Sequence, residues 1–126
     1  MNIFTAKVIT GSGRGKSLKV PTLNLDPAAL SVTIKEGIYA CYVQIGKKIY
    51  TGAFHYGPRP VFDDSTSCEV HLLDAEVTKA PEEVIVELVH RIRDVQNFPS
   101  VEALMQEIAE DITAARGILA LSSTSL

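Results

Sequence analysis

Residues 10–17, Thr-Gly-Ser-Gly-Arg-Gly-Lys-Ser, combine the residue types that hold phosphate groups. Closely spaced glycines let a backbone approach a ligand and turn its N–H groups toward an anion, and the basic side chains add positive charge at the same place. These glycines and basic residues are Gly11, Gly13, Gly15, Arg14 and Lys16. The segment therefore indicates a phosphate-binding loop, with a solvated hairpin loop as the alternative.

The same loop matches the P-loop motif G-x-x-x-x-G-K-[ST] only in part. The motif requires a glycine where this chain has Thr10, and it requires a helix whose N-terminus completes the phosphate cradle. Pro21 follows Ser17 too closely for a long helix to begin there. We therefore interpret the segment as a glycine-rich loop that is not a P-loop.

A series of short predicted strands surrounds this loop in the sequence and must position it. Five or six segments alternate apolar and polar residues between turn residues, which is typical of strands. They are residues 3–10, 20–25, 37–45, 49–55, 67–74 and 84–91. A turn at 46–48 predicts a hairpin, and the two prolines of 57–60 predict a break in the ladder. No helical pattern separates the early strands, which excludes a Rossmann-type βαβ unit.

The apolar period changes to that of a helix only near the C-terminus. Apolar residues recur there at steps of three and four: Val101, Leu104, Met105, Ile108, Ile112 and Ala115. Ser100 is the expected N-cap, Gly117 the expected C′ residue, and residues 121–126 the expected frayed end. The pattern as a whole predicts a mostly β fold, a small antiparallel barrel with one C-terminal helix packed outside.

Composition narrows the class of protein. The 126 residues fit a single domain, 1–126, and 46% hydrophobic with 21% charged residues is ordinary for a globular chain. A net charge of −3 argues against a general nucleic-acid binder, and no apolar run is long enough to span a membrane. We expect a cytoplasmic protein in which Cys41 and Cys68 are buried, reduced thiols.

The residues after the loop extend it to the run G-x-G-R-G-x-x-L-x-x-P-T-x-N-L, which ends at Leu25. This run resembles the signature of the riboflavin kinase (flavokinase) family, whose pattern ends in PTAN. Further matches follow in order at 37–40 (GIYA), 57–60 (GPRP), 68–74 (CEVHLLD) and 93–100 (RDVQNFPS). The resemblance extends over about residues 4–116 and so includes nearly the whole chain.

This resemblance implies a six-stranded Greek-key barrel that transfers the γ-phosphate of ATP to the ribityl 5′-hydroxyl of riboflavin and so makes FMN. ATP and riboflavin would be the substrates, and Mg²⁺ or another divalent cation the cofactor. No nucleic acid or membrane partner is expected, and we expect a monomer. In bacteria the family's domain often follows an FMN adenylyltransferase domain. No such segment is apparent here, so adenylylation is expected from another protein.

The resemblance also implies roles for three polar residues. Thr22 and Asn24 would lie beside the metal and phosphates, because hydroxyl and amide oxygens suit a hard cation. The alternative is a turn in which both bond their own backbone. Glu69 would be the general base, with a solvent-facing strand glutamate as the alternative. His71 shares the strand face of Glu69 by period two, and we expect it to be a structural neighbour.

Flavin binding is assigned by resemblance to the segment before the helix. Arg93 would reach a flavin phosphate or ring oxygen, Phe98 would lie against the isoalloxazine ring, and Gln96 stands where the family often has lysine. The alternative for Phe98 is a hydrophobic staple before the Ser100 cap.

Several positions depart from the family pattern. Lys19 replaces a glycine, Leu23 the alanine of PTAN, and Val61 a threonine, while Lys79-Ala80-Pro81 stands in place of Leu-Tyr-Gly. These changes leave the nucleotide and metal preference open. They also leave an alternative function, a catalytically degenerate module that binds flavin or FMN.

Overall fold

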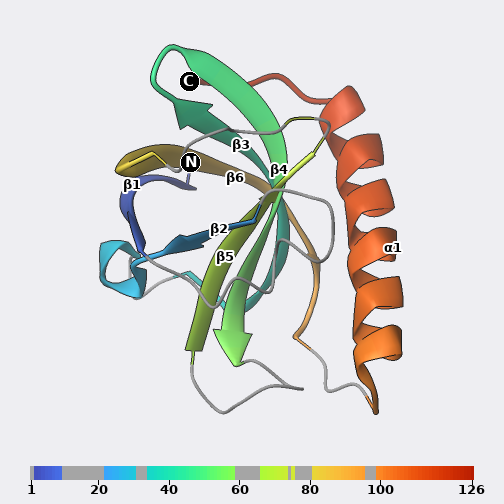
Figure 1. Ribbon diagram of the computed structural model, residues 1–126. Helices are drawn as coiled ribbons and strands as arrows, with labels where there is room; N and C mark the ends of the chain where they lie inside the picture. The colour runs from blue at the N-terminus through green and yellow to red at the C-terminus, as the bar shows by residue number, and fades with distance from the viewer. Residues whose placement is uncertain are drawn as a thin grey trace.

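The computed structural model describes residues 2–9, 22–30, 34–58, 66–73, 75, 81–95 and 99–126. Within these residues, six strands and one long helix make up the fold (Figure 1). They are β1 (Asn2–Ile9), β2 (Thr22–Leu25), β3 (Gly37–Ile45), β4 (Lys48–Pro58), β5 (Thr66–Leu72), β6 (Glu83–Arg93) and α1 (Val101–Ala120), with a short 3-10 helix, η2 (Pro27–Ala29), after β2.

The strands close into a barrel in the order β1-β2-β5-β4-β3-β6. Every neighbouring pair is antiparallel. Strands β3, β4 and β5 follow one another as a meander and β6 returns beside β3, which is the Greek-key arrangement. The predicted fold class is therefore confirmed, with α1 standing along one side of the barrel in Figure 1.

The barrel interior is filled by every second residue of the strands, as a period of two requires. Phe54 is fully buried at its centre, with its ring centroid 5.7 Å from that of Phe4 and 6.1 Å from that of Tyr39. Leu23, Val70 and other buried residues complete this core; the remaining buried members are Ala6, Leu25, Cys41, Val43, Cys68, Leu72, Val84, Val86 and Leu88. Both cysteines are free and buried, as predicted, and burial raises the pKa of Cys68 to about 12.

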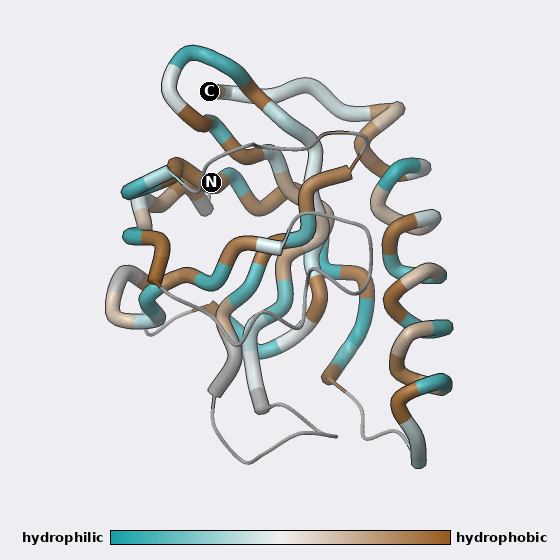
Figure 2. Tube along the Cα trace, viewed as in Figure 1, coloured by the Kyte–Doolittle hydropathy of each residue, from teal (hydrophilic) through white to brown (hydrophobic). Residues whose placement is uncertain are grey.

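A second apolar cluster lies outside the barrel, beneath α1. Strand β3 is buried on both faces, so Ala40 and Tyr42 point away from the barrel core and pack with Ala115 and Leu119 of the helix. The Tyr42 hydroxyl donates a hydrogen bond of 3.3 Å to the Leu119 carbonyl. Figure 2 shows apolar and polar residues alternating along α1, with much of the apolar side toward the barrel. Among the described residues, no helix has the length and apolar character needed to cross a membrane.

The start of the helix is as predicted, but part of its apolar face and its C-terminal end differ from the sequence-based expectation. Ser100 is the N-cap, as predicted, and accepts a 3.2 Å hydrogen bond from the Ala103 N–H. Val101 and Met105, predicted on the apolar face, are 45% and 42% exposed. Gly117, predicted to end the helix, lies within it. Packing of Leu119 against the barrel outweighs the cost of about 1 kcal/mol for a helical glycine.

The ladder break predicted for residues 57–60 does not begin at Gly57, and residues 59 and 60 lie outside the described part of the chain. The strand continues through Gly57 and Pro58, which pair with Ser67 and Thr66 of β5. Proline is tolerated because it is the last residue of the strand, where the missing backbone N–H donor costs the least stability. Gly57 has φ +146°, and a Cβ there would lie 2.8 Å from Val95 Cγ2, so only glycine lets the chain bend at this point.

The C-terminal residues, expected to be frayed, are held against β6. Glu87 is a buried carboxylate that accepts 2.9 Å hydrogen bonds from the Thr124 hydroxyl and the Ser125 N–H. Burial alone would raise the pKa of Glu87, but these donors outweigh it and lower that pKa. Leu126 packs on the cluster beneath α1. The tail thus ties the end of the helix region to the barrel wall.

Thr124→Val should lower the free energy of unfolding by about 1–3 kcal/mol, because it leaves a buried carboxylate without one donor. The folded pKa of Glu87 is depressed, so its contribution is present above the unfolded pKa and is lost as pH falls through the folded pKa. The difference in urea unfolding should therefore be largest near neutral pH and shrink in acid. The matched control is Thr113→Val on the exposed side of α1, which should change stability little.

Candidate active site

Polar side chains gather in two adjacent rows of cross-strand neighbours on the outer face of β2, β5 and β4. Asn24 of β2 is directly opposite Glu69 of β5, and Glu69 is directly opposite His55 of β4. In the next row Thr22 is opposite His71, which is opposite Ala53. Directly opposite residues on one face have Cβ atoms about 4.5–5.5 Å apart. We call the five polar residues of these two rows together the polar row; they are Thr22, Asn24, Glu69, His71 and His55.

The sequence directs these residues outward because their neighbours belong inside. Leu23, Val70 and Phe54 alternate with them along the three strands and are buried in the barrel core. Each side chain of the polar row is half-buried. The departure from the family pattern at Leu23 therefore fills the core and does not enter the row. The alternative in which Thr22 and Asn24 form a turn does not hold, since both lie in a paired strand.

His71 contacts the candidate metal-side residue directly. The Thr22 Oγ1 atom lies 2.9 Å from His71 Nδ1, a hydrogen bond between residues 49 positions apart. Burial lowers the pKa of His71, although the carboxylates of Glu69 and Asp111 oppose this. The neutral ring has one nitrogen that accepts, so it can accept a hydrogen bond from the Thr22 hydroxyl. Sequence reasoning placed His71 on the correct face but did not find this contact.

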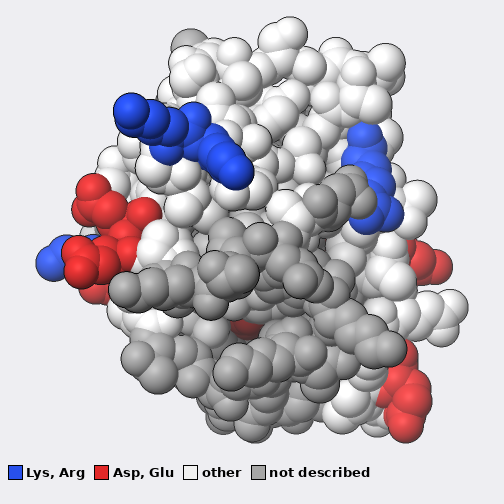
Figure 3. Space-filling model, turned by 45° about the horizontal axis from the view of Figure 1, so that its top comes forward, with Lys and Arg blue, Asp and Glu red and all other residues white. Residues whose placement is uncertain are grey.

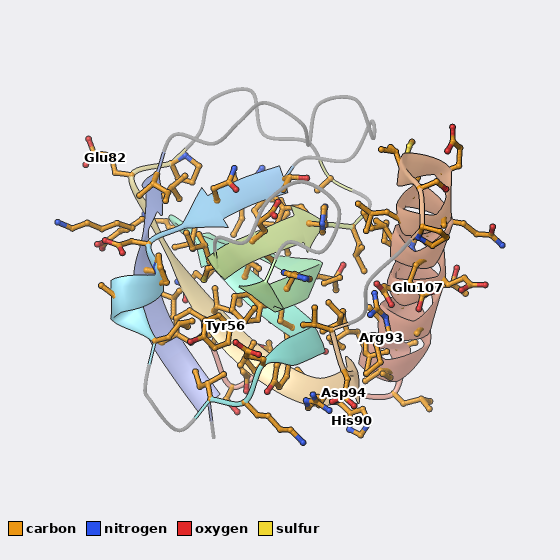
Figure 4. The ribbon with its side chains drawn as sticks, turned by 90° about the horizontal axis from the view of Figure 1, so that it is seen from below. Tyr56, Glu82, His90, Arg93, Asp94 and Glu107 are labelled. Atoms are coloured by element: carbon orange, nitrogen blue, oxygen red, sulfur yellow. The ribbon has the colours of Figure 1, made fainter. Side chains whose placement is uncertain are left out.

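Arg93, the expected flavin-binding arginine, forms ion pairs with two acidic side chains of α1. Its guanidinium forms a bidentate ion pair with Asp111: Nε donates to Oδ1 and Nη2 donates to Oδ2, both at 2.8 Å. Glu107 lies 3.0 Å from Nε, and Nη1 donates to the Asp94 carbonyl at 2.8 Å. Figure 4 shows Arg93 beside Glu107 of α1. The role of Arg93 toward flavin stays a prediction.

Asp111 is the functional-region residue that sequence reasoning missed. It is 6% exposed on the barrel-facing side of α1, and its carboxylate acts electrostatically on His71 as well as on Arg93. The signal was present in the sequence, because Asp111 stands four residues before Ala115 within the apolar stripe of the helix. A carboxylate at such a position needs a partner, and Arg93 supplies it.

A neighbouring cluster fixes the end of β6. The Arg91 guanidinium donates from Nη2 to the Glu36 carbonyl at 2.6 Å and also pairs with Asp94. That partner holds the pKa of the exposed Asp94 carboxyl below its usual value. Gly37, with φ +156°, lies against this guanidinium, and a Cβ there would come within 2.6 Å of Arg91 Nε. Arg91 therefore anchors the backbone from which Arg93 projects.

The oxygen donors of the polar row fit a hard divalent cation. A threonine hydroxyl, an asparagine amide and a glutamate carboxylate are ligand types that Mg²⁺ accepts. Among the described residues, no group of three or more His, Cys, Asp and Glu side chains could hold a metal ion.

Several predicted site residues lie outside the described residues. These are the loop residues Gly11, Gly13, Arg14, Gly15 and Lys16, and the flavin-side residues Gln96 and Phe98. The family departures at Lys19, Val61, Lys79 and Ala80 lie outside them as well. On the face shown in Figure 3, the described lysines and arginines form separate groups, so the described part of that face carries no continuous basic surface.

The family model and the curated relatives agree on one family. The family model described as riboflavin kinase (Flavokinase) matches residues 2–119. The bifunctional riboflavin kinase/FMN adenylyltransferase of Escherichia coli K12 is 32% identical over 121 residues, which cover 94% of this chain and 38% of that protein. The RNA-binding riboflavin kinase RibR of Bacillus subtilis is 25% identical, covering 90% of this chain and 49% of that protein.

A solved structure shares the fold. It is described as a macrolide-efflux protein from Streptococcus pneumoniae, and it matches with a TM-score of 0.74 and 29% identity. The match covers 90% of this chain and 38% of that protein. The chain thus spans less than half the length of each relative named here.

Proposed function

Because the chain belongs to the riboflavin kinase family, we propose that the protein transfers the terminal phosphate of ATP to the ribityl 5′-hydroxyl of riboflavin, forming FMN and ADP. The observation that carries the proposal is the register of β2 and β5, which sets Asn24 opposite Glu69 and Thr22 opposite His71. A proton acceptor and two oxygen donors for a cation therefore lie on one face.

In the proposed reaction the Glu69 carboxylate accepts the proton of the 5′-hydroxyl. The alcohol oxygen forms a bond to the γ-phosphorus, and the bond from that phosphorus to the β–γ bridging oxygen breaks. Thr22 and Asn24 would hold a divalent cation such as Mg²⁺, which when bound neutralises charge on the phosphates. Positioning and charge stabilisation supply most of the rate increase in such transfers.

Flavin would bind on the helix side of the polar row. Arg93, held by Asp111 and Glu107, lies there at the end of β6. The glycine-rich loop that precedes β2 would contribute backbone N–H groups and the charges of Arg14 and Lys16 to the nucleotide phosphates. We also propose that the protein acts as a cytoplasmic monomer without a nucleic-acid partner.

The proposal is tested by incubating the purified chain with riboflavin, a divalent cation and a nucleoside triphosphate, and by separating FMN from riboflavin chromatographically. ATP and GTP are compared, each with Mg²⁺, Mn²⁺ and Zn²⁺. FMN formation that needs both nucleotide and cation is the expected result. Flavin binding without FMN formation under every combination would instead support a degenerate flavin-binding module.

A further inference from the structure

The imidazole of His71 is tied to the candidate cation site by a hydrogen bond. Its Nδ1 lies 2.9 Å from the Thr22 hydroxyl oxygen, and the two residues face each other across β2 and β5. On the other side of His71, the opposite residue of β4 is Ala53, which is buried in the cluster beneath α1. The cross-strand neighbours of His71 are therefore a small apolar residue on one side and Thr22 on the other.

A threonine hydroxyl that holds a cation must present its oxygen lone pairs and direct its hydrogen elsewhere. Left to itself, the hydroxyl rotates among several directions, and only some of them suit a cation. An acceptor at 2.9 Å on the protein side removes that freedom, because the hydroxyl then donates its hydrogen bond to the acceptor and its lone pairs are directed outward. Nδ1 of a neutral imidazole is such an acceptor.

We propose that His71 is a positioning residue for Thr22: its Nδ1 accepts a hydrogen bond from the hydroxyl and so orients the Thr22 oxygen to bind a divalent cation. This inference rests on the proposed function and adds a residue to it. In the tautomer that carries its hydrogen on Nε2, Nδ1 is the acceptor for the Thr22 hydroxyl.

The test compares His71→Phe with His71→Asn and His71→Gln. An asparagine amide can place an acceptor where Nδ1 lies, a glutamine amide reaches the place of Nε2, and phenylalanine keeps the ring shape without an acceptor. FMN formation is measured against Mg²⁺ concentration, against riboflavin concentration, and in parallel with thermal unfolding. The matched control is His90→Phe, a histidine exposed on β6 and outside the polar row (Figure 4).

His71→Phe should raise the Mg²⁺ concentration for half-maximal rate about fivefold, the effect of one lost hydrogen bond, and leave the KM for riboflavin within about twofold. His71→Asn should restore most of the loss, and His71→Gln should not. In a Thr22→Val background His71→Phe should have no further effect, because the interaction it removes is already absent. A purely structural role would not produce this separation of cation dependence from stability.

Each other outcome is decisive. The inference is overturned if the Mg²⁺ dependence of His71→Phe is unchanged, or if the effects of the Thr22 and His71 changes are additive. In either case, FMN formation by the wild type would still support the proposed function. If His71→Phe does not fold, equal Mg²⁺ dependence in the Asn and Gln variants overturns it. A wild-type chain that makes no FMN with any cation removes the proposed function and this inference together.

Discussion

Glu69→Gln should lower the rate of FMN formation by on the order of 100-fold or more, with flavin affinity little changed. The amide keeps the size and hydrogen-bonding capacity of the side chain but cannot accept the proton of the attacking alcohol at neutral pH. Because Asn24 and His55 face Glu69 from both sides, the substituted side chain should stay in place. Single-turnover FMN formation and quenching of flavin fluorescence measure the two quantities separately.

The matched control is Glu82→Gln, an exposed glutamate that points away from the barrel in Figure 4. It should leave both turnover and flavin affinity unchanged. If Glu69→Gln turns over at the wild-type rate, Glu69 is not the base, and positioning and charge stabilisation alone carry the reaction. If instead flavin binding is lost together with turnover, Glu69 contributes to binding and not to proton transfer.

Asp111→Ala should lower the free energy of unfolding by about 3 kcal/mol, the cost of leaving one partner of a buried ion pair alone. The Arg93 side chain is 16% exposed and the Asp111 side chain 8%, so water replaces little of the lost interaction. Glu107 remains near Nε and compensates in part. Urea unfolding followed by circular dichroism measures the loss directly.

The same variant should also raise the KM for riboflavin, because Asp111 holds Arg93 at the end of β6. Glu110→Ala is the matched control, since Glu110 is an exposed carboxylate on the adjacent position of α1. That change should alter unfolding by no more than about 0.5 kcal/mol. An Asp111→Ala protein as stable as the Glu110→Ala protein would show that the pair with Arg93 contributes no net stability.

The local patterns of this chain were readable from the sequence. The alternation of Val84, Val86 and Leu88 gave a strand face that is buried, and residues 37–45 form the predicted strand with the same bounds. Ser100 was identified as the N-cap from its residue type and the apolar period that follows it. Such features depend on contacts within one or two turns of chain, and residue type alone decides them.

Errors arose where a distant contact overrode a local preference. Gly117 is a poor helix residue, yet the helix continues because Leu119 and Tyr42, on elements far apart in sequence, pack together. Gly57 and Pro58 are poor strand residues, yet β5 provides paired neighbours for both. The tail was expected to fray because nothing in its own sequence reveals that Glu87 binds it.

The sequence by itself determined the strand order along the chain, that Glu69 and His71 share one strand face, and the family to which the chain belongs, because alternation and motif spacing are properties of neighbouring residues. Tertiary structure alone decided that Thr22 meets His71 across 49 positions and that Arg93 pairs with Asp111 across 18. Closure of the barrel fixes the register of β2 against β5, and packing of α1 fixes its rotation. Neither quantity is set by local residue preferences.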